Sequence, residues 1–223
     1  MLYLFDIDGT LIGGDGSGRR AFDRACLDCM GIVGALDHLR LDGMTDPLIL
    51  DAVFRHHHDR APTAVEARHI LDTYVRHLEG EVAEGKYHVK PAVHETLDLL
   101  EGRGATIGLA TGNVEIGARI KLQRGDLWRR FAFGGFGDDA PATANGRAEL
   151  VRAAIARGVA RAGRTFLRDE VFVIGDTPKD VEAAHAAGAR AIAVATGWFT
   201  LEQLAASGAD AVYPTLAEWR ATI

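Results

Sequence analysis

Short apolar runs alternate with helical patterns along most of this chain, and this alternation constrains the fold more than any other feature. Three glycine-bounded runs, Ala105–Ala110, Val171–Ile174 and Ala191–Ala195, are typical of strands buried on both faces, and Leu2–Phe5 opens the chain as a further strand. The helical patterns around them cover residues 93–100, 116–123, 148–157 and 181–187. Strands that alternate with helices predict an α/β fold with a Rossmann-like parallel sheet and helices on both faces.

The segment from residue 13 to residue 88 breaks this alternation. It contains no convincing buried strand but has amphipathic helical stretches at residues 46–56 and 63–84. A structureless loop of that length is implausible inside a compact fold, so we expect an inserted helical domain at 13–88 and a core made of 1–12 and 89–223. Closely spaced glycines at 13–18 and the stretch Gly85–Pro91 supply the two joints.

Composition excludes several classes of protein. The 223 residues are 48% hydrophobic and 25% charged, which is ordinary for a globular chain with a substantial core. A formal charge of -6 offers no broad positive surface for nucleic acid. No apolar run is long enough to span a membrane, and no signal-peptide pattern opens the chain. We therefore expect a cytoplasmic protein, a monomer or homodimer, without a nucleic-acid or membrane partner.

Two clusters of metal-binding residue types have simpler interpretations. Cys26 and Cys29 form a CxxC inside a helical pattern, without the further ligands of a zinc site, and we interpret the pair as incidental. His56, His57 and His58 are consecutive on a predicted helix and therefore point in different directions. We interpret these three histidines as a solvated helix end.

Two carboxylates follow the first strand directly, in Asp6-Ile7-Asp8-Gly9-Thr10. Because the chain turns at Gly9, the two acids can do different work at one centre, one attacking and the other handling a proton. The alternative is a calcium loop, which requires a Glu at its twelfth position. Counted from Asp6, that position is Ser17, so the calcium interpretation fails.

Two further polar segments come after later strands. Thr111-Gly112-Asn113 follows the strand at 105–110 and precedes a helix, so its hydroxyl and backbone N–H groups can face an anion. Asp176 and Asp180 lie in Gly175-Asp176-Thr177-Pro178-Lys179-Asp180, where Pro178 begins a helix. Each segment alone is also an ordinary helix-capping turn. Ligands in such sheets bind beyond the carboxyl ends of the strands, where all three segments are expected.

The ordered set DIDGT, TGN and GDTPKD resembles the haloacid dehalogenase superfamily of phosphohydrolases, and most of all its phosphoglycolate-phosphatase-like branch. The resemblance covers nearly the whole chain and places 13–88 where that superfamily carries a helical cap. It implies that Asp6 is the nucleophile and forms an aspartyl-phosphate, and that Asp8 is the general acid and base. An ordinary Asp is ionised at neutral pH, so negative charge from Asp6 and the phosphate would have to raise the pKa of Asp8.

The resemblance also implies a magnesium site and a phosphate site. Mg²⁺ would be held by the carboxylates of Asp6 and Asp176 and the backbone carbonyl of Asp8, with support from Asp180. Thr111 would act with the catalytic residues on the phosphoryl group. The remaining residues expected at the substrate are Thr10, Gly112, Asn113 and Lys121.

The cation that pairs with the phosphate has two candidates. The family pattern has a Lys or Arg before the helix that precedes the GDxxxD strand, and Arg147 in Asn145-Gly146-Arg147 fits this position. Its planar fork suits phosphate oxygens. Lys121 is the alternative, but it lies about two helical turns beyond Thr111, roughly 10 to 12 Å along the axis. We favour Arg147.

Two loops border the predicted site. Residues 134–139, Gly-Gly-Phe-Gly-Asp-Asp, lack the spacing of a P-loop, and we expect a tight loop there. Residues 41–46 of the inserted segment, Leu-Asp-Gly-Met-Thr-Asp, are expected to face the substrate or to cap the helix that follows.

The sequence thus predicts a magnesium-dependent phosphatase for a small phosphorylated metabolite, either phosphoglycolate-like or a sugar phosphate. A sugar phosphomutase remains open, because the same two aspartates can pass a phosphoryl group between hydroxyls. A dehalogenase is disfavoured, because its chemistry needs no acid at the position of Asp8. The alternative of another class is a phosphate-binding module without turnover.

Overall fold

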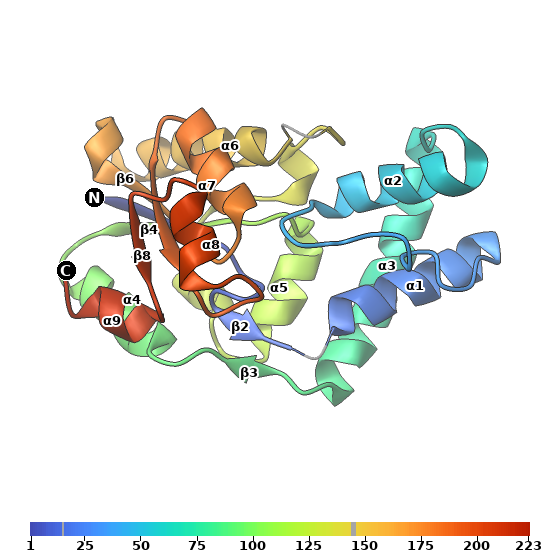
Figure 1. Cartoon of the computed structure of the whole chain (residues 1–223), viewed down its shortest axis with the longest axis horizontal. Helices are drawn as coiled ribbons and strands as arrows, with labels where there is room; N and C mark the ends of the chain where they lie inside the picture. The colour runs from blue at the N-terminus through green and yellow to red at the C-terminus, as the bar shows by residue number, and fades with distance from the viewer. Residues whose placement is uncertain (15, 144–145) are drawn as a thin grey trace.

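The computed structural model describes residues 1–14, 16–143 and 146–223 and contains a six-stranded sheet in the order β5-β4-β1-β6-β7-β8 (Figure 1). Every strand pair in this sheet is parallel. β1 lies at the centre, between β4 and β6, so the residues after it emerge in the middle of the carboxyl edge. The predicted α/β sheet is confirmed. Its strands are β1 (Leu2–Phe5), β4 (Thr106–Ala110), β5 (Gly134–Gly135), β6 (Val171–Gly175), β7 (Arg190–Val194) and β8 (Ala211–Tyr213).

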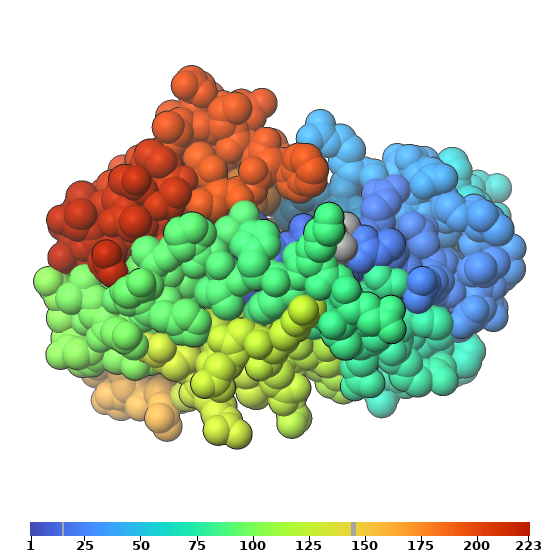
Figure 2. All heavy atoms as spheres, turned by 90° about the horizontal axis from the view of Figure 1, so that it is seen from below, coloured from blue at the N-terminus to red at the C-terminus, as the bar shows by residue number. Residues whose placement is uncertain are grey.

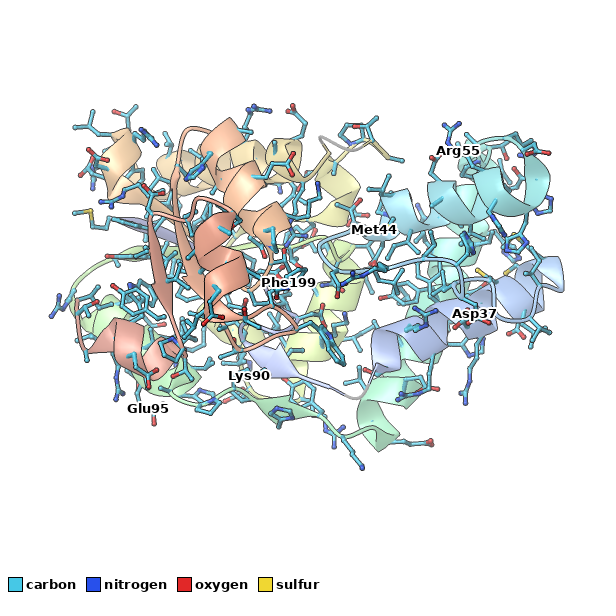
Figure 3. The ribbon with its side chains drawn as sticks, viewed as in Figure 1. Asp37, Met44, Arg55, Lys90, Glu95 and Phe199 are labelled. Atoms are coloured by element: carbon cyan, nitrogen blue, oxygen red, sulfur yellow. The ribbon has the colours of Figure 1, made fainter. Side chains whose placement is uncertain are left out.

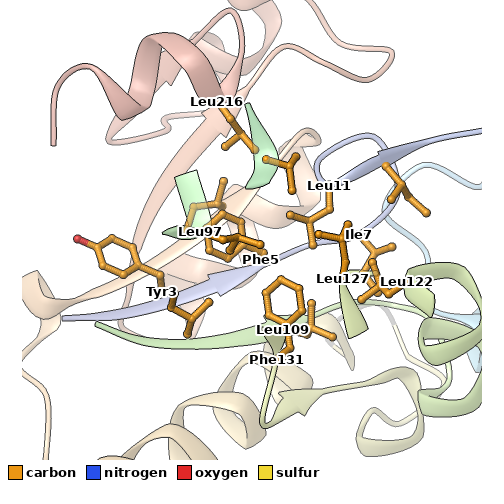
Figure 4. Close-up of a cluster of buried hydrophobic side chains, with 14 of the residues drawn as sticks. Tyr3, Phe5, Ile7, Leu11, Leu97, Leu109, Leu122, Leu127, Phe131 and Leu216 are labelled. Atoms are coloured by element: carbon orange, nitrogen blue, oxygen red, sulfur yellow. The ribbon is translucent and has the colours of Figure 1, made fainter. Parts of the chain in front are cut away.

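Helices cover both faces of the sheet, and β1 shows why. Tyr3 and Phe5 point to one face, where they pack with apolar residues of α4 (Val93–Gly102), α5 (Glu115–Gln123) and α9 (Leu216–Arg220), as Figure 4 shows in part. Leu2 and Leu4 point to the other face, which is covered by α6 (Gly146–Ala162), α7 (Pro178–Ala186) and α8 (Leu201–Ala206). Burial of each Leu or Phe side chain stabilises the folded state by about 1.5–3 kcal/mol relative to exposure to water. This two-sided burial fixes the position of the acids that follow Phe5.

The inserted segment forms three helices with their own apolar core. They are α1 (Ser17–Met30), α2 (Asp46–His58) and α3 (Ala64–Glu84), and they form a lobe beside the sheet (Figure 1). The space-filling view shows this lobe in blue and cyan at one end of the molecule (Figure 2). Phe22 of α1 and Tyr74 of α3 are buried at the centre of this core, with ring centroids 4.9 Å apart. Where the chain enters and leaves the lobe, β2 (Ile12–Gly13) and β3 (His88–Val89) pair as an antiparallel ladder.

Several short elements were not predicted. The stretch 134–139, expected to be a tight loop, contains β5 and a 3₁₀ turn, Gly137–Asp139, and further 3₁₀ turns lie at Trp128–Arg130 and Arg168–Glu170. Glycines have low strand propensity, so no sequence signal marked β5. Its position depends on packing, because a Cβ at Gly135 would overlap the Leu150 carbonyl oxygen of α6. Strands β2, β3 and β8 and helices α8 and α9 were also missed.

The cysteines are free within α1, as expected for an incidental pair. Burial raises the pKa of the Cys26 thiol to about 12, so this thiol is protonated and unreactive at neutral pH. Within the described ranges, no helix combines the length and apolar character needed to cross a membrane.

Candidate active site

Three buried carboxylates meet at the carboxyl edge of the sheet. Asp6 follows β1 and Asp176 follows β6, and these strands are neighbours in the sheet. Asp180 lies in the first turn of α7. Each acid offers one oxygen, and these three oxygens lie within 4.8 Å of one another. The structure therefore brings together Asp6, Asp176 and Asp180, the three predicted metal-binding side chains.

The DIDGT turn fits closely around Asp176. Gly9 has a φ of 83°, a left-handed conformation that favours glycine, and a Cβ there would overlap the Asp176 carboxylate. Thr10 was predicted to contact substrate, but its hydroxyl is buried and donates a hydrogen bond to Oδ1 of Asp176 over 3.2 Å. In this structure Thr10 therefore orients an acid of the cluster.

Arg147 lies within the acid cluster, where it contacts two of the three carboxylates. Its Nη2 is 3.0 Å from Oδ1 of Asp6, and its Nε donates to Oδ1 of Asp180 over 3.0 Å. The second oxygen of Asp180 accepts the backbone N–H and the hydroxyl of Thr177, in a capping box that begins α7. Asp180 thus caps α7 and also lies in the acid cluster. Asn145, quoted with Arg147 in the sequence motif, lies outside the described residues.

The electrostatics of the cluster favour a bound cation. Among the described residues, Arg147 is the one basic side chain that forms ion pairs in this cluster, and it pairs with two of the three acids, Asp6 and Asp180. Desolvation, opposed by Arg147 and reinforced by Asp180, raises the pKa of Asp6 to about 7, and desolvation likewise raises the pKa of Asp176 well above its usual range. Clustered carboxylate oxygens are the ligands that Mg²⁺ prefers. The donor set therefore fits a hard divalent cation.

Asp8 faces different partners. Lys121 Nζ lies 2.9 Å from Oδ1 and 2.7 Å from Oδ2 of Asp8, and the Asn113 amide donates to Oδ2 over 2.8 Å. The same amide nitrogen is 2.8 Å from the hydroxyl of Thr111, which is fully buried. Although desolvation acts in the opposite direction, Lys121 and Asn113 lower the pKa of Asp8. We had expected the pKa of Asp8 to be raised by nearby negative charge. Lys121 and Asn113 outweigh the effects that raise it, so the expected direction of the shift is wrong for this structure.

Lys121 lies closer to the predicted site than its position in the sequence suggested. The axial distance from Thr111 had counted against it, yet its buried ammonium contacts Asp8 and also donates to Oδ1 of Asn113 over 2.6 Å. The last turn of α5 packs beside the loop after β1, so the distance along the helix axis was the wrong measure. The two candidate cations therefore take separate places, Arg147 at Asp6 and Lys121 at Asp8.

The loop at residues 41–46 docks onto the TGN segment. The backbone N–H of Asp46 donates to the Gly112 carbonyl over 2.8 Å, and Oδ2 of Asp46 accepts the Val114 N–H over 2.9 Å. A Cβ on Gly112 would overlap the Met44 carbonyl oxygen, so the two loops are in direct contact. Thr45 caps α2, as one interpretation of this loop predicted. The contact between Asp46 and Val114 was missed, because neither residue carries a signal for the other.

Comparisons with known proteins agree with this architecture. The family described as haloacid dehalogenase-like hydrolase matches residues 3–194. A probable phosphatase, IndB, of Dickeya dadantii is 34% identical over 130 residues, which are 58% of this chain and 54% of that protein. A phosphoglycolate phosphatase of Escherichia coli is 26% identical over 158 residues, 71% of this chain and 60% of that protein. The aligned part of this chain thus spans little more than half the length of these relatives.

Solved structures share the fold at low sequence identity. CbbY from Rhodobacter sphaeroides in complex with phosphate superposes with a TM-score of 0.75 at 22% identity, covering 97% of this chain and 95% of that one. A hydrolase from Pseudomonas syringae gives a TM-score of 0.73 at 23% identity, with 95% and 92% of the two chains covered. Because the family model matches residues 3–194, which is most of its length, this chain belongs to the haloacid dehalogenase-like hydrolases.

Proposed function

We propose that this protein is a magnesium-dependent phosphatase that hydrolyses a small phosphorylated metabolite through an aspartyl-phosphate on Asp6. The observation that carries the proposal is the unequal pair of acids after β1. Asp6 is buried in an acid cluster that fits a divalent cation, whereas Asp8, two residues later, is held by an ammonium and an amide. Two carboxylates in such different surroundings suit two different roles.

In this proposal Asp6 attacks phosphorus and Arg147 pairs with the phosphoryl oxygens. The Arg147 guanidinium already contacts Oδ1 of Asp6, so it lies beside the attacking atom and can stabilise charge that develops there. Asp6, Asp176 and Asp180, with the backbone carbonyl of Asp8, would hold Mg²⁺. When bound, the ion would neutralise phosphoryl charge as a Lewis acid and lower the pKa of Asp6.

The negative charge of a bound phosphoryl group would raise the pKa of Asp8 from its lowered position in this structure, so that Asp8 would protonate the leaving alcohol and then activate the water that hydrolyses the aspartyl-phosphate. Lys121 and Asn113 orient its carboxylate through three hydrogen bonds. Thr111 and the backbone at Gly112 would contact the phosphoryl oxygens. The Thr111 hydroxyl accepts a hydrogen bond from Asn113, which orients it and leaves its own hydrogen to donate to a phosphoryl oxygen.

We further propose that residues 13–88 act as a cap over the core formed by 1–12 and 89–223. The β2–β3 ladder joins the two parts, and the loop at residues 41–46 docks beside the site, where closure of the cap would exclude bulk water. The enclosed position of Lys121 favours a small substrate. The similarity to proteins named phosphoglycolate phosphatase makes phosphoglycolate a first compound to assay.

The proposal is tested by measuring inorganic phosphate released from an aryl phosphate and from a panel of phosphorylated metabolites, with Mg²⁺ and after chelation. Asp6→Asn should lower kcat roughly 10³-fold or more, because it removes the nucleophile. Asp98→Asn, at an exposed acid of α4, is the matched control. Isomerised sugar phosphate without free phosphate would favour a mutase. Binding of phosphate without any turnover would leave only a binding module.

A further inference from the structure

Three exposed histidines converge in the helical lobe. His38 lies in the segment between α1 and α2, and His56 and His57 lie in the last turn of α2. One ring nitrogen from each histidine lies within 4.8 Å of those of the other two. Figure 3 labels the sequence neighbours Asp37 and Arg55 in the half of the molecule remote from the sheet. This cluster, His38 with His56 and His57, is independent of the proposed phosphatase chemistry.

The predicted solvated helix end at residues 56–58 is confirmed, because all three histidines are exposed in the last turn of α2, but two of them also join a cluster that the sequence did not indicate. His58 points toward Phe54, with ring centroids 5.2 Å apart, and takes no part in the cluster. His38, 18 positions before His56, takes its place. The ring of His38 stacks on that of His56 with centroids 3.7 Å apart and meets the ring of His57 edge-on at 5.6 Å. Only the folded lobe brings these rings together.

Both segments that carry the cluster are anchored. Two residues before His38, Leu36 is fully buried, its N–H donates to Asp23 and its carbonyl accepts from Arg19 over 2.6 Å. On α2, Val53 and Phe54 are buried in the apolar core of the lobe just before His56. The exposed rings can therefore turn, while the backbone that carries them is held in place.

The chemistry of the cluster selects a class of ligand. Neutral imidazole nitrogens suit Zn²⁺, Cu²⁺ and Ni²⁺, whereas Mg²⁺ prefers oxygen. The carbonyl groups at the end of α2 also place partial negative charge near these rings. We propose that His38, His56 and His57 bind one divalent transition-metal ion of the zinc class. Three histidines with one open position for water form a known type of zinc coordination.

The geometry needs a modest adjustment of the rings. A tetrahedral ion at ~2.05 Å from each nitrogen holds the nitrogens roughly 3.3 Å apart, and the observed separations lie within 4.8 Å. His38 and His56 are stacked, so one ring must rotate for both lone pairs to face the ion. Rotation about side-chain bonds achieves this at an exposed site without moving the backbone.

A metal ion bound to the histidine cluster would stabilise the helical lobe and take no part in the proposed phosphatase reaction. Helix α2 has 13 residues and is therefore about 20 Å long, and its other end carries the loop that docks on Gly112. An ion bound to the cluster would tie the segment leading to this loop to the far end of α2. Because the ion binds the folded lobe, it should raise thermal stability in proportion to the logarithm of its concentration above the dissociation constant.

The test is a titration of metal-stripped protein with Zn²⁺ and, separately, with Co²⁺, both in excess Mg²⁺, which would occupy the acid cluster under the function proposed above. Calorimetry gives stoichiometry, the visible spectrum of Co²⁺ reports nitrogen ligands, and thermal unfolding reports stabilisation. We expect one Zn²⁺ per chain, with a dissociation constant in the micromolar range or below. His38→Ala and His57→Ala should each weaken binding by at least about tenfold, since even the loss of an outer-shell partner costs ~10–100-fold.

His58→Ala is the matched control, because His58 is an exposed neighbour on the same turn but outside the cluster. Its retained binding, together with the loss in the two cluster variants and unchanged far-ultraviolet circular dichroism, would support the site. Three results would overturn it: no saturable binding below millimolar Zn²⁺, equal loss in His58→Ala, or full binding by His38→Ala. The last result would show that His38 only packs against the helix end.

Discussion

Asp46 carries a buried charge at the contact between the helical lobe and the core, and its removal should stabilise the protein at neutral pH. The side chain is 6% exposed, and its partner is a backbone N–H, that of Val114. Desolvation is the main cause that raises the pKa of Asp46, to about 6 from a usual value of 3.8, with Lys121 and the Val114 N–H opposing it. Ionisation of this group therefore opposes the folded, docked state.

The sign follows from proton counting. Between pH ~4 and ~6 the folded state holds a proton on Asp46 that the unfolded state has released, so stability falls as pH rises through this window. The difference of about 2 pH units corresponds to about 3 kcal/mol at pH 7. Below pH ~4 both states are protonated, and this cost disappears.

The substitution Asp46→Asn keeps the shape of the side chain and an oxygen that can accept the Val114 N–H. We expect the free energy of unfolding to exceed that of the wild type by up to about 3 kcal/mol at pH 7, and the difference to vanish near pH 4. Urea unfolding at several pH values, followed by circular dichroism, measures it. Asp51→Asn is the control, because Asp51 is buried on the same helix but forms an ion pair with Arg55.

An Asp46→Asn variant that is less stable than the wild type at pH 7 would refute this reasoning. It would mean that the carboxylate gains more from the N-terminus of α5 than it loses in desolvation. A gain that is equal at pH 4 and pH 7 would also refute it, because the benefit would then not come from the removed charge.

Two further substitutions test the site. Gly112→Ala places a Cβ against the Met44 carbonyl and should push the loop at residues 41–46 away. We expect the free energy of unfolding to fall by about 1–3 kcal/mol and kcat to fall as well. Unchanged unfolding and kinetics would show that the docking is unimportant. Lys121→Met should raise the pKa of Asp8 and move the alkaline limb of kcat for an alkyl phosphate to higher pH, since kcat reports the enzyme–substrate complex, in which the acid would stay protonated longer. Arg119→Met, exposed on the same helix, is its control, and a rise in KM with an unmoved limb would instead indicate substrate binding.

The sequence predicted the parts of the fold that depend on local pattern. Apolar runs such as Leu2–Phe5 are buried wherever they lie in an α/β sheet, and the ends of parallel strands share one edge. This is why Asp6 and Asp176, 170 positions apart, were correctly expected to be neighbours. The main helices were also found, with their ends shifted by a few residues, as between the predicted 181–187 and α7 at Pro178–Ala186.

Strand β5 and the partner of Asp8 escaped prediction for different reasons. Gly134–Gly135 is a strand because β4 and α6 leave room only for glycine backbone. Strand propensities of single residues do not predict a strand that depends on such packing. Lys121 reaches Asp8 across 113 positions because α5 packs beside the loop after β1. Strand β5 and the contact between Lys121 and Asp8 both depend on how helices and strands pack against one another. A short window of sequence does not contain that information.

The sequence by itself determined the α/β framework and the acids at its carboxyl edge, because hydrophobic periodicity and strand ends are local properties. Only the tertiary structure decided the pKa values of those acids and the residues that contact them. Burial without enough counter-charge raises the pKa of Asp6, Lys121 lowers that of Asp8, and the folded lobe carries His38 to His56 and His57. Desolvation and charge pairing act through space, so they become defined only once distant segments have met.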